Sequence, residues 1–373
     1  MNADEDIFLS KLTQAWNHQL DLSELITSAN NLHTQQLYVY EAILYKVWLS
    51  RYTTSVNHLV YFNYGTSLFS NGDMDGAKDA YLEALRLSSE FIQPHFNLGI
   101  IYEREGRFDL AFSEWLWIVN NEASKQDEYR NIHLLALNNL GRLYESRRQY
   151  SEALFYLTKS LNVEPNQPDT IHHWIFLRER LCEWPIYAPI NGVSQEQMQE
   201  CTSALAMLSL SDDPAQQLAA AKHFVERKLP VTEPFTLPQI YKHKRIRIGY
   251  LSSDLCLHPV AMLTAELFEL HDKKHFEIYA YCWSREDGSA LRSRIMQAVD
   301  HFERIQDITD LAAAELIRNH EIDILIDLHG QTLGARPGIL AYRPAPIQVT
   351  YLGLPATTGF PFIDYVITDK FLT

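Results

Sequence analysis

The chain has 373 residues and a mass of 43.2 kDa, and 46% of its residues are hydrophobic, so it can fill the cores of two or three globular domains. Its formal net charge of −15 would repel a polyphosphate backbone, which argues against general nucleic-acid binding. No run approaches about 18 uninterrupted apolar residues and the N-terminus "MNADEDIFLS" is acidic, so the sequence predicts neither a membrane span nor a secretory signal, and the expected compartment is the cytoplasm.

The first 60 residues have a helical pattern, for example in "YEAILYKVWLSRY", and we interpret residues 1–60 as degenerate helical repeats or a cap. A clearer repeat follows in residues 61–168. The segments "NYGTSLFSNGDMDGAKDAYLEAL", "NLGIIYEREGRFDLAFSEWLWIV" and "NLGRLYESRRQYSEALFYLTKSL" align with one another. The second unit carries about eight extra residues near "NEASKQDEYR".

Each repeat has a glycine followed twelve residues later by an alanine, and the first two glycines, Gly65 and Gly99, are 34 residues apart. Small residues at those two places let two helices approach closely, and large neighbours such as Tyr81 and Trp115 fill the space between them. The period and the residue types resemble the tetratricopeptide repeat. A solenoid of this kind is a binding module, so we expect it to hold peptide segments of partner proteins.

Residues 169–240 form a predicted helical connector and linker. "IHHWIFLRERLCEWPIY" is expected to be one helix ended by Pro185 and Pro189, and Asp212 and Asp213 before Pro214 look like the N-cap of another. The proline-spaced stretch "LPVTEPFTLPQIYKHK" then places a domain boundary near residue 240.

Residues 241–373 alternate between strands and helices. The predicted strands are "RIRIGYL", "FEIYAYCW", "IDILIDL", "IQVTYL" and "YVIT", and the predicted helices are "PVAMLTAELFEL", "GSALRSRIMQAV" and "DLAAAELIRNHE". Such alternation indicates a parallel, Rossmann-like sheet with right-handed crossovers. Ligands collect beyond the carboxyl ends of such strands, where the loops "SSDLCLHPV", "HGQTLGARP" and "GLPATTG" are expected.

Several chemistries have no support in the sequence. There is no GxGxxG and no P-loop lysine, which argues against a hydride-transfer or phosphoryl-transfer enzyme. The four cysteines lie apart without CxxC spacing, so neither a zinc site nor a disulfide framework is indicated.

The order of these motifs resembles a known family. Tetratricopeptide repeats followed by "RIRIGYLSSDLCLHPV", "IDILIDLHGQTLGARPGILAYRPAPIQVTYLGLPATTG" and "DYVITD" are similar to the O-linked N-acetylglucosamine transferases and their SPINDLY relatives, in particular the bacterial branch. The resemblance covers roughly residues 60 to 373. It implies the fold class α + α/β: a helical repeat solenoid followed by the first Rossmann-like half of a two-Rossmann (GT-B) glycosyltransferase.

The resemblance also implies an activity, namely inverting transfer of a sugar from a nucleotide donor to a serine or threonine hydroxyl of a protein. Donors in the family are UDP-N-acetylglucosamine, or GDP-fucose among SPINDLY members. No metal and no other cofactor is expected, because the family neutralises the leaving diphosphate with protein groups. A nucleotide sugar and protein substrates are therefore the expected partners, with no nucleic acid and no membrane.

His258 matches the family histidine of "SSDxxxHP" and is the expected catalytic residue. It precedes Pro259, which suits the first turn of a helix, and an imidazole there can hydrogen-bond a hydroxyl or a phosphate. Whether it is the base or only orients the acceptor stays open, and a capping or packing role is the alternative.

The resemblance assigns two further groups to the donor sugar. Gly330 and Thr332 match the family "G-x-T" motif, whereas His329 departs from the asparagine or threonine usual beside it. Asp327 is as suited to capping a loop as to touching substrate, and His320 is expected at the surface.

Leu352 and Gly353 match the loop that packs against the sugar. Its glycine permits close backbone approach, and Pro355, Thr357 and Thr358 stiffen and line the pocket. A structural strand-to-turn element is the alternative. The remaining cations of this region, Arg336 and Arg343, are predicted to be structural.

Family members continue with a second Rossmann-like half, so we interpret the 373 residues as repeats, connector and the first half of a catalytic cleft. We predict negligible transferase activity for this polypeptide alone, and robust transfer of labelled sugar to a protein acceptor would contradict that prediction. The alternative function is a non-catalytic tetratricopeptide scaffold.

Overall fold

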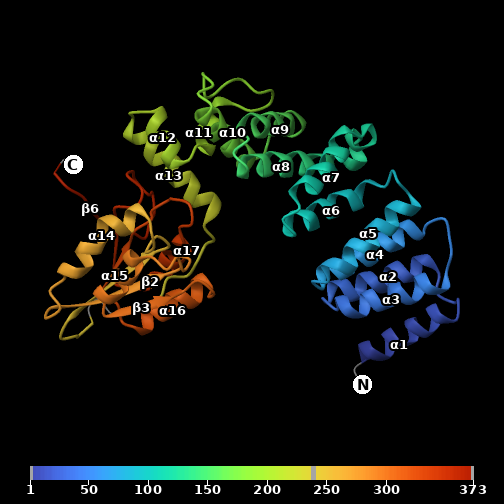
Figure 1. Cartoon of the computed structure of the whole chain (residues 1–373), viewed down its shortest axis with the longest axis horizontal. Helices are drawn as coiled ribbons and strands as arrows, with labels where there is room; N and C mark the ends of the chain where they lie inside the picture. The colour runs from blue at the N-terminus through green and yellow to red at the C-terminus, as the bar shows by residue number, and fades with distance from the viewer. Residues whose placement is uncertain (1–2, 237–240, 371–373) are drawn as a thin grey trace. The chain divides into compact units, whose positions relative to one another are not determined.

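The computed structural model describes residues 3–236 and 241–370, which fall into two compact units (Figure 1). The first unit contains the chain up to Thr170 together with Ile190–Gly192. The second contains Ile171–Pro189 and the chain from Val193 onwards. The predicted boundary near residue 240 lies outside the described residues, but the helices of the predicted connector from Ile171 onwards share a unit with the sheet.

The first unit is a series of helices joined by short turns. Its helices are α1 Ala3–Trp16, α2 Leu22–Thr34, α3 Tyr38–Arg51, α4 Asn57–Ser70, α5 Met74–Leu87, α6 Ile92–Arg104, α7 Phe108–Asn120, α8 Arg130–Ser146 and α9 Tyr150–Val163. The recognisable repeats are the pairs α4 with α5, α6 with α7 and α8 with α9, and in each pair the two helices pack closely on one another. The helices expected before residue 60 are α1 to α3.

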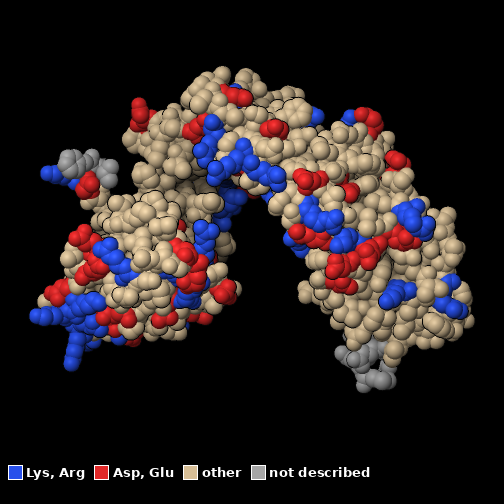
Figure 2. All heavy atoms as spheres, viewed as in Figure 1, with Lys and Arg blue, Asp and Glu red and all other residues tan. Residues whose placement is uncertain are grey.

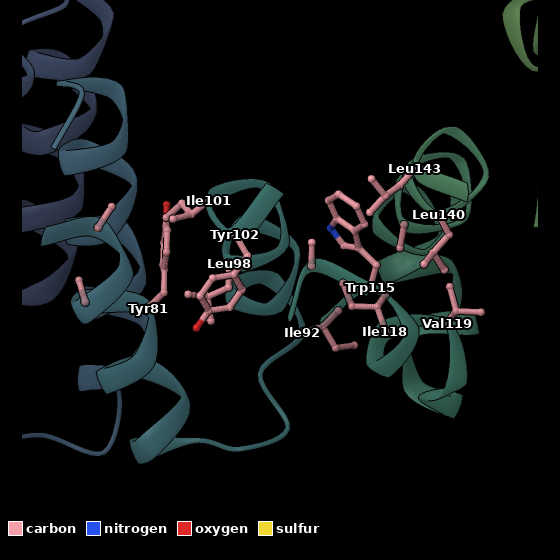
Figure 3. Packing of buried hydrophobic residues seen from close by; sticks show 14 of the residues in the cluster. Tyr81, Ile92, Leu98, Ile101, Tyr102, Trp115, Ile118, Val119, Leu140 and Leu143 are labelled. Carbon is pink, nitrogen blue, oxygen red and sulfur yellow. The ribbon is translucent and has the colours of Figure 1, made fainter. Parts of the chain in front are cut away.

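The glycines of the repeats lie where a large side chain of the paired helix crosses. A Cβ on Gly65 would lie 2.7 Å from the ring of Tyr81, and a Cβ on Gly99 would lie 2.3 Å from Trp115 Nε1. Both aromatic side chains are fully buried and point into the space between neighbouring helices (Figure 3). The predicted register, in which small residues face large ones, is confirmed.

The extra residues of the second repeat form two short 3₁₀ helices, η1 Glu122–Lys125 and η2 Asp127–Tyr129, between α7 and α8. Ser124 anchors this insertion. Its buried hydroxyl lies 2.6 Å from the Ile118 carbonyl oxygen and 2.9 Å from His133 Nδ1. The insertion therefore ends one repeat and starts the next without opening the core.

Four helices precede the sheet: α10 Pro168–Arg180, α11 Gln195–Cys201, α12 Ala204–Leu210 and α13 Pro214–Lys228. Asp213 caps α13 and Pro214 occupies its first turn, as predicted. The prediction that the first of these helices runs to Pro185 is wrong. It ends at Arg180 because Cys182 adopts a left-handed φ of 55°, and the Arg178 side chain donates to the carbonyls of Glu183, Pro185 and Ile186.

The second unit contains a six-stranded parallel sheet in the order β3-β2-β1-β4-β5-β6. Its strands are β1 Ile246–Ser252, β2 Phe276–Cys282, β3 His301–Arg304, β4 Ile324–Asp327, β5 Ile347–Tyr351 and β6 Tyr365–Ile367. The predicted strands are confirmed, but β3 was not predicted. It is four residues long with two charged or titratable ends, and its side chains are only partly buried, so no apolar run marks it.

Four helices cover the sheet: α14 Pro259–Leu270, α15 Ala290–Ala298, α16 Asp310–Asn319 and the unpredicted α17 Pro337–Ala341. Alternate strand residues point to opposite faces. Tyr250 packs with α14 and α15, whereas its neighbour Leu251 packs with α16 and α17. The result is a three-layer α/β arrangement, as the alternation of elements predicted.

The surface mixes charges of both signs. On the face shown in Figure 2, acidic and basic side chains are interspersed over the helices of each unit, although the sequence carries 15 more acidic than basic residues. Among residues 3–236 and 241–370, no helix combines the length and the apolar character that crossing a membrane requires.

Candidate functional site

The candidate site lies where the strand order of the sheet reverses. The chain runs from β1 outward to β2 and β3, then returns to the other side of β1 with β4 and continues to β5 and β6. The loops that leave the carboxyl ends of β1 and β4 therefore diverge at one edge, which is the place where ligands bind in open α/β sheets. His258 follows β1, and Gly330 and Thr332 follow β4.

His258 is the N-cap of α14. Its Nδ1 accepts a hydrogen bond of 3.3 Å from the backbone N–H of Val260, and Pro259 occupies the first helical turn. The side chain is 43% exposed, so part of the imidazole is open to a ligand. The backbone N–H of Leu257 donates to Asp287 Oδ2 at 2.6 Å, which fixes the loop just before the histidine.

Asp254 is the carboxylate that sequence reasoning missed. Its Oδ2 lies 3.6 Å from His258 Nδ1 and 3.7 Å from His329 Nδ1, and its Oδ1 accepts from the Ser253 hydroxyl at 3.0 Å. The side chain is only 19% exposed. An acidic residue four positions before the histidine in the same rim loop was the available signal, since such a carboxylate can orient an imidazole.

His329 is the most buried of these groups, with a side chain that is 1% exposed. Its Nε2 accepts from the backbone N–H of Ser253 at 2.8 Å, and its Nδ1 lies 2.9 Å from Thr332 Oγ1. Burial lowers the pKa of the His329 imidazole, and the nearby Asp254 carboxylate opposes that shift. His329 thus links the β1 loop to the β4 loop.

Asp327 caps the loop after β4. Its buried carboxylate accepts from the backbone N–H groups of His329 at 3.1 Å and of Gly330 at 2.7 Å. Burial raises the pKa of Asp327 to about 6, while these two amides act in the opposite direction. The contacts favour the capping role over contact with substrate. Gly330 needs its left-handed φ of 62° to make this turn.

The Leu352–Gly353 loop packs directly on the β4 loop. A Cβ on Gly353 would lie 2.4 Å from the Leu328 carbonyl oxygen and 2.6 Å from His329 Cα. The close backbone approach that we predicted is therefore made to protein. Leu352 turns the chain with a left-handed φ of 69°.

The rest of that loop is divided between surface and interior. Pro355 and Thr357 are exposed, whereas Thr358 is buried and its carbonyl accepts from Gln331 Nε2 at 2.6 Å. The expectation that Thr358 lines a pocket is therefore wrong, because its side chain packs inside. Pro355 and Thr357 remain predicted donor contacts.

The connector helix α13 forms part of the same rim. Gln331 Nε2 also donates to the Ala221 carbonyl at 2.9 Å, and a Cβ on Gly359 would lie 2.9 Å from the Lys222 nitrogen. Leu354 packs with Ala221 and Ala204. No sequence motif indicated this contact between connector and sheet.

Arg292 holds the loop after β1 by hydrogen bonds. The sequence did not predict this role. Its side chain is 2% exposed, and it donates to the Leu255 carbonyl at 2.8 Å and to Ser284 Oγ at 2.7 Å. Its other nitrogens donate to the Glu286 carboxylate at 2.8 and 2.6 Å. A buried arginine in a helix carries no local pattern that separates it from a surface one.

The other titratable residues have structural contacts. Arg336 donates to Asp310 and to the Ile305 carbonyl, and Arg343 pairs with Asp364, as predicted for structural arginines. The prediction that His320 is a surface residue is wrong. The ring is half-buried, its Nδ1 lies 2.9 Å from the Tyr281 hydroxyl, and burial lowers its pKa.

The loops that carry His258, Gly330, Thr332, Leu352 and Gly353 thus meet around Asp254 and His329 at one edge of the sheet. Within the described ranges, 3–236 and 241–370, no group of three or more His, Cys, Asp or Glu side chains is arranged to hold a metal ion.

The chain is similar to known proteins in both units. A family model described as Glycosyl transferase family 41 matches residues 211–373. Tetratricopeptide repeat models match residues 59–91 and 136–170.

Two curated relatives each match a little over a third of this chain. The "UDP-N-acetylglucosamine--peptide N-acetylglucosaminyltransferase" of Caenorhabditis elegans is 45% identical over 127 residues, which is 34% of this chain and 11% of that protein. The Arabidopsis thaliana protein named "Probable UDP-N-acetylglucosamine--peptide N-acetylglucosaminyltransferase SEC" is 42% identical over 146 residues, 39% of this chain and 15% of that protein. The chain thus spans 11 to 15% of the length of these two relatives.

Among solved structures, a mutant of the Thermobaculum terrenum O-GlcNAc transferase aligns with a TM-score of 0.46 and 23% identity, covering 86% of this chain and 55% of that chain. A Pseudomonas aeruginosa pilF structure aligns with a TM-score of 0.42 and 15% identity, covering 58% of this chain and 93% of that one. Residues 211–373 of this chain therefore match glycosyl transferase family 41, and two segments of the helical region before them match tetratricopeptide repeats.

Proposed function

We propose that the protein is an inverting protein O-glycosyltransferase that moves N-acetylglucosamine from UDP-N-acetylglucosamine to serine or threonine hydroxyls of proteins held by its repeats. The observation that carries the proposal is the meeting of the His258 loop and the Gly353 loop at the switch point of a family 41 sheet. The names of the relatives support the donor and the acceptor.

The reaction joins the acceptor oxygen to the anomeric carbon and breaks the bond from that carbon to the diphosphate oxygen. The nucleoside diphosphate leaves with the bond's electron pair, and the hydroxyl proton passes to a base. An imidazole with an unperturbed pKa near neutrality can accept this proton or donate to the departing phosphate. His258 is the partly exposed imidazole at the rim and takes one of these roles.

The two neighbours of His258 Nδ1 decide between the roles. When Nδ1 accepts from Val260 N–H, the ring proton is on Nε2, which then acts as a donor. When Nδ1 carries the proton and turns toward Asp254, 3.6 Å away, Nε2 has a free lone pair and acts as a base. Asp254 is the proposed orienting carboxylate for the second setting.

We propose that the donor contacts are Gly330, Thr332, Leu352, Gly353, Pro355 and Thr357, that transfer needs no metal, and that the protein works in the cytoplasm. Four cysteines without a disulfide support a reducing compartment.

The test uses the protein purified from its own cells. It is incubated with UDP-N-acetylglucosamine and a serine- and threonine-containing peptide library, and mass spectrometry detects peptides that gain one N-acetylhexosamine. His258→Asn is the informative variant, because asparagine keeps an N-cap but cannot take a proton at working pH. Transfer is expected for the parent protein and lost in this variant.

A failure to modify any peptide, with GDP-fucose and other nucleotide sugars also supplied, would contradict the proposal. If immobilised protein still retains partner peptides through its repeats, that result would favour the non-catalytic scaffold. Transfer of fucose in place of N-acetylglucosamine would keep the reaction class and change the donor.

A further inference from the structure

His329 lies at a junction of four segments that leave the carboxyl edge of the sheet. Ser253 comes from the loop after β1, Trp283 from the segment after β2, Thr332 from the loop after β4 and Gly353 from the loop after β5. The indole of Trp283 lies 5.2 Å from the imidazole between ring centroids, and its Nε1 donates to the Gly334 carbonyl at 2.9 Å.

The contacts of His329 determine where its proton is. A backbone N–H only donates, so the 2.8 Å bond from Ser253 requires a lone pair on Nε2. A neutral imidazole with an unprotonated Nε2 carries its hydrogen on Nδ1. That hydrogen is then donated to Thr332 Oγ1 at 2.9 Å.

This bond sets the polarity of the Thr332 hydroxyl. Its oxygen accepts from the imidazole, so the hydroxyl hydrogen is left to donate. In the part of the chain that the structure describes, no carbonyl or carboxylate accepts that hydrogen. The Thr332 side chain is partly exposed at the rim, where it can donate to an acceptor oxygen of a bound molecule.

The burial and the hydrogen bonds of His329 agree with a neutral ring. Asp254 Oδ2 is 3.7 Å from Nδ1, beyond a hydrogen bond, and it is shared with His258. The Asp327 carboxylate accepts a hydrogen bond from the His329 backbone N–H. Burial lowers the pKa of His329, the Asp254 carboxylate opposes that shift, and His258 adds to it. A proton on Nε2 would face the Ser253 N–H donor.

We propose that His329, in the Nδ1–H tautomer, is a positioning residue that joins the β1 and β4 loops and turns the Thr332 hydroxyl into a hydrogen-bond donor for the nucleotide sugar. This inference rests on the proposed function for the identity of the ligand, and on the structure alone for the tautomer. Because the ring is neutral, the Asp254 carboxylate is left to orient His258.

The first experiment measures the tautomer in the 373-residue chain. With ¹⁵N-histidine labelling, long-range ¹H–¹⁵N spectra separate a protonated from an unprotonated ring nitrogen, and loss of one signal set in His329→Asn assigns the residue. The expected result is an Nδ1–H, Nε2-unprotonated ring between pH 8 and pH 6.5. A ring with the proton on Nε2, or a doubly protonated ring at pH 7, would overturn the inference.

The second experiment measures the donor role in the protein from its own cells. Thr332→Val keeps the shape and removes the hydroxyl, so KM for UDP-N-acetylglucosamine should rise about 3- to 10-fold, the weight of one hydrogen bond. Thr332→Ser keeps the hydroxyl and should restore the parent KM. An unchanged KM in the valine variant would reject the donor role of Thr332.

The two experiments separate failure of the inference from failure of the proposed function. If no sugar is transferred by the parent protein while the ring has its expected tautomer, the function is wrong and the positioning of the loops stands. If transfer occurs and the ring has the opposite tautomer, the function stands and the inference is wrong.

Discussion

The backbone of Gly353 lies against the backbone of His329, with only 2.6 Å between a Cβ at position 353 and His329 Cα. Backbone atoms cannot rotate away as a side-chain end can, so a methyl group here must separate the β4 and β5 loops. Gly353→Ala is therefore expected to destabilise the second unit by about 2 kcal/mol or more. The measurement is hydrogen exchange at the amides of β4 and β5.

The matched control for that change is Thr357→Ala in the same loop. Its side chain is exposed, so the free energy of opening should stay within about 0.5 kcal/mol of the parent value. Equal protection in Gly353→Ala and the parent chain would show that the loops separate without cost.

In the repeats, the effect of a glycine-to-alanine change on stability should change sign when the side chain that crosses the glycine is removed. Alanine for Gly99 gains about 1 kcal/mol of helix propensity but places a methyl group on Trp115, an overpacking that costs about 1–3 kcal/mol. We expect net destabilisation of α6 and α7, measured by thermal unfolding. In a Trp115→Ala background the same change should stabilise, and a loss of stability in both backgrounds would reject the steric explanation.

Removing Arg292 should loosen the loop that carries His258. Arg292→Met keeps the buried volume but leaves the Leu255 carbonyl without its donor, at a cost of about 1–3 kcal/mol. The cost stays below that of a broken buried ion pair because the Glu286 carboxylate is 64% exposed and can be solvated once Arg292 is gone. Faster hydrogen exchange across residues 255–257 is the readout, and Arg294→Met, which breaks an exposed pair with Glu269, is the control.

Asp327 gives a pH dependence with a defined sign. Its folded pKa, about 6, is above the ordinary value of 3.8, so the folded chain binds this proton more tightly than the unfolded chain between those limits. The contribution of Asp327 to the free energy of unfolding therefore falls as pH rises from about 4 to 6.5, by no more than about 3 kcal/mol.

The comparison with Asp327→Asn isolates this effect, since histidines such as His320 titrate alike in both proteins. Asparagine offers one carbonyl oxygen for two backbone N–H donors, which adds an offset that does not depend on pH. The free energy of unfolding of the parent minus that of the variant, measured in urea titrations, should therefore decrease as pH rises from 4 to 6.5. A constant difference would mean that the carboxyl group titrates normally.

The capping role of His258 is separable from its chemistry. His258→Ala loses the bond to Val260 N–H and should cost about 0.5–1 kcal/mol, whereas His258→Asn should leave stability nearly unchanged. Thermal unfolding distinguishes the two, and both should lack transferase activity. Equal stability of all three proteins would show that the 3.3 Å bond contributes nothing to α14.

The repeat of about 34 residues and the alternation of strand-like and helix-like segments made most of the fold predictable. The repeat was found because Gly65, Gly99 and their partner side chains recur in register, and the sheet because apolar runs alternate with helical ones. The polar strand His301–Arg304 and the short helix Pro337–Ala341 carry no such pattern, since pairing with β2 and packing on the sheet form them.

The candidate site was predictable where a motif marks it and not where packing builds it. His258 and Gly353 stand in recognisable motifs, and the structure adds that the close backbone approach at the glycine is made to the β4 loop. Asp254, Arg292 and His329 matter through contacts 30 or more residues away in sequence, and one chain without its fold does not reveal such pairs.

Because α13 packs on Gly359 and Gln331, the sheet cannot be separated from this helix without exposing a buried surface. A recombinant piece that starts at β1 would uncover Leu354 and the buried side of the rim, inviting aggregation. Exchanging the α/β unit between related proteins should therefore carry the stretch from Ile171 along with the sheet, so that each graft keeps the helices that cover Leu354.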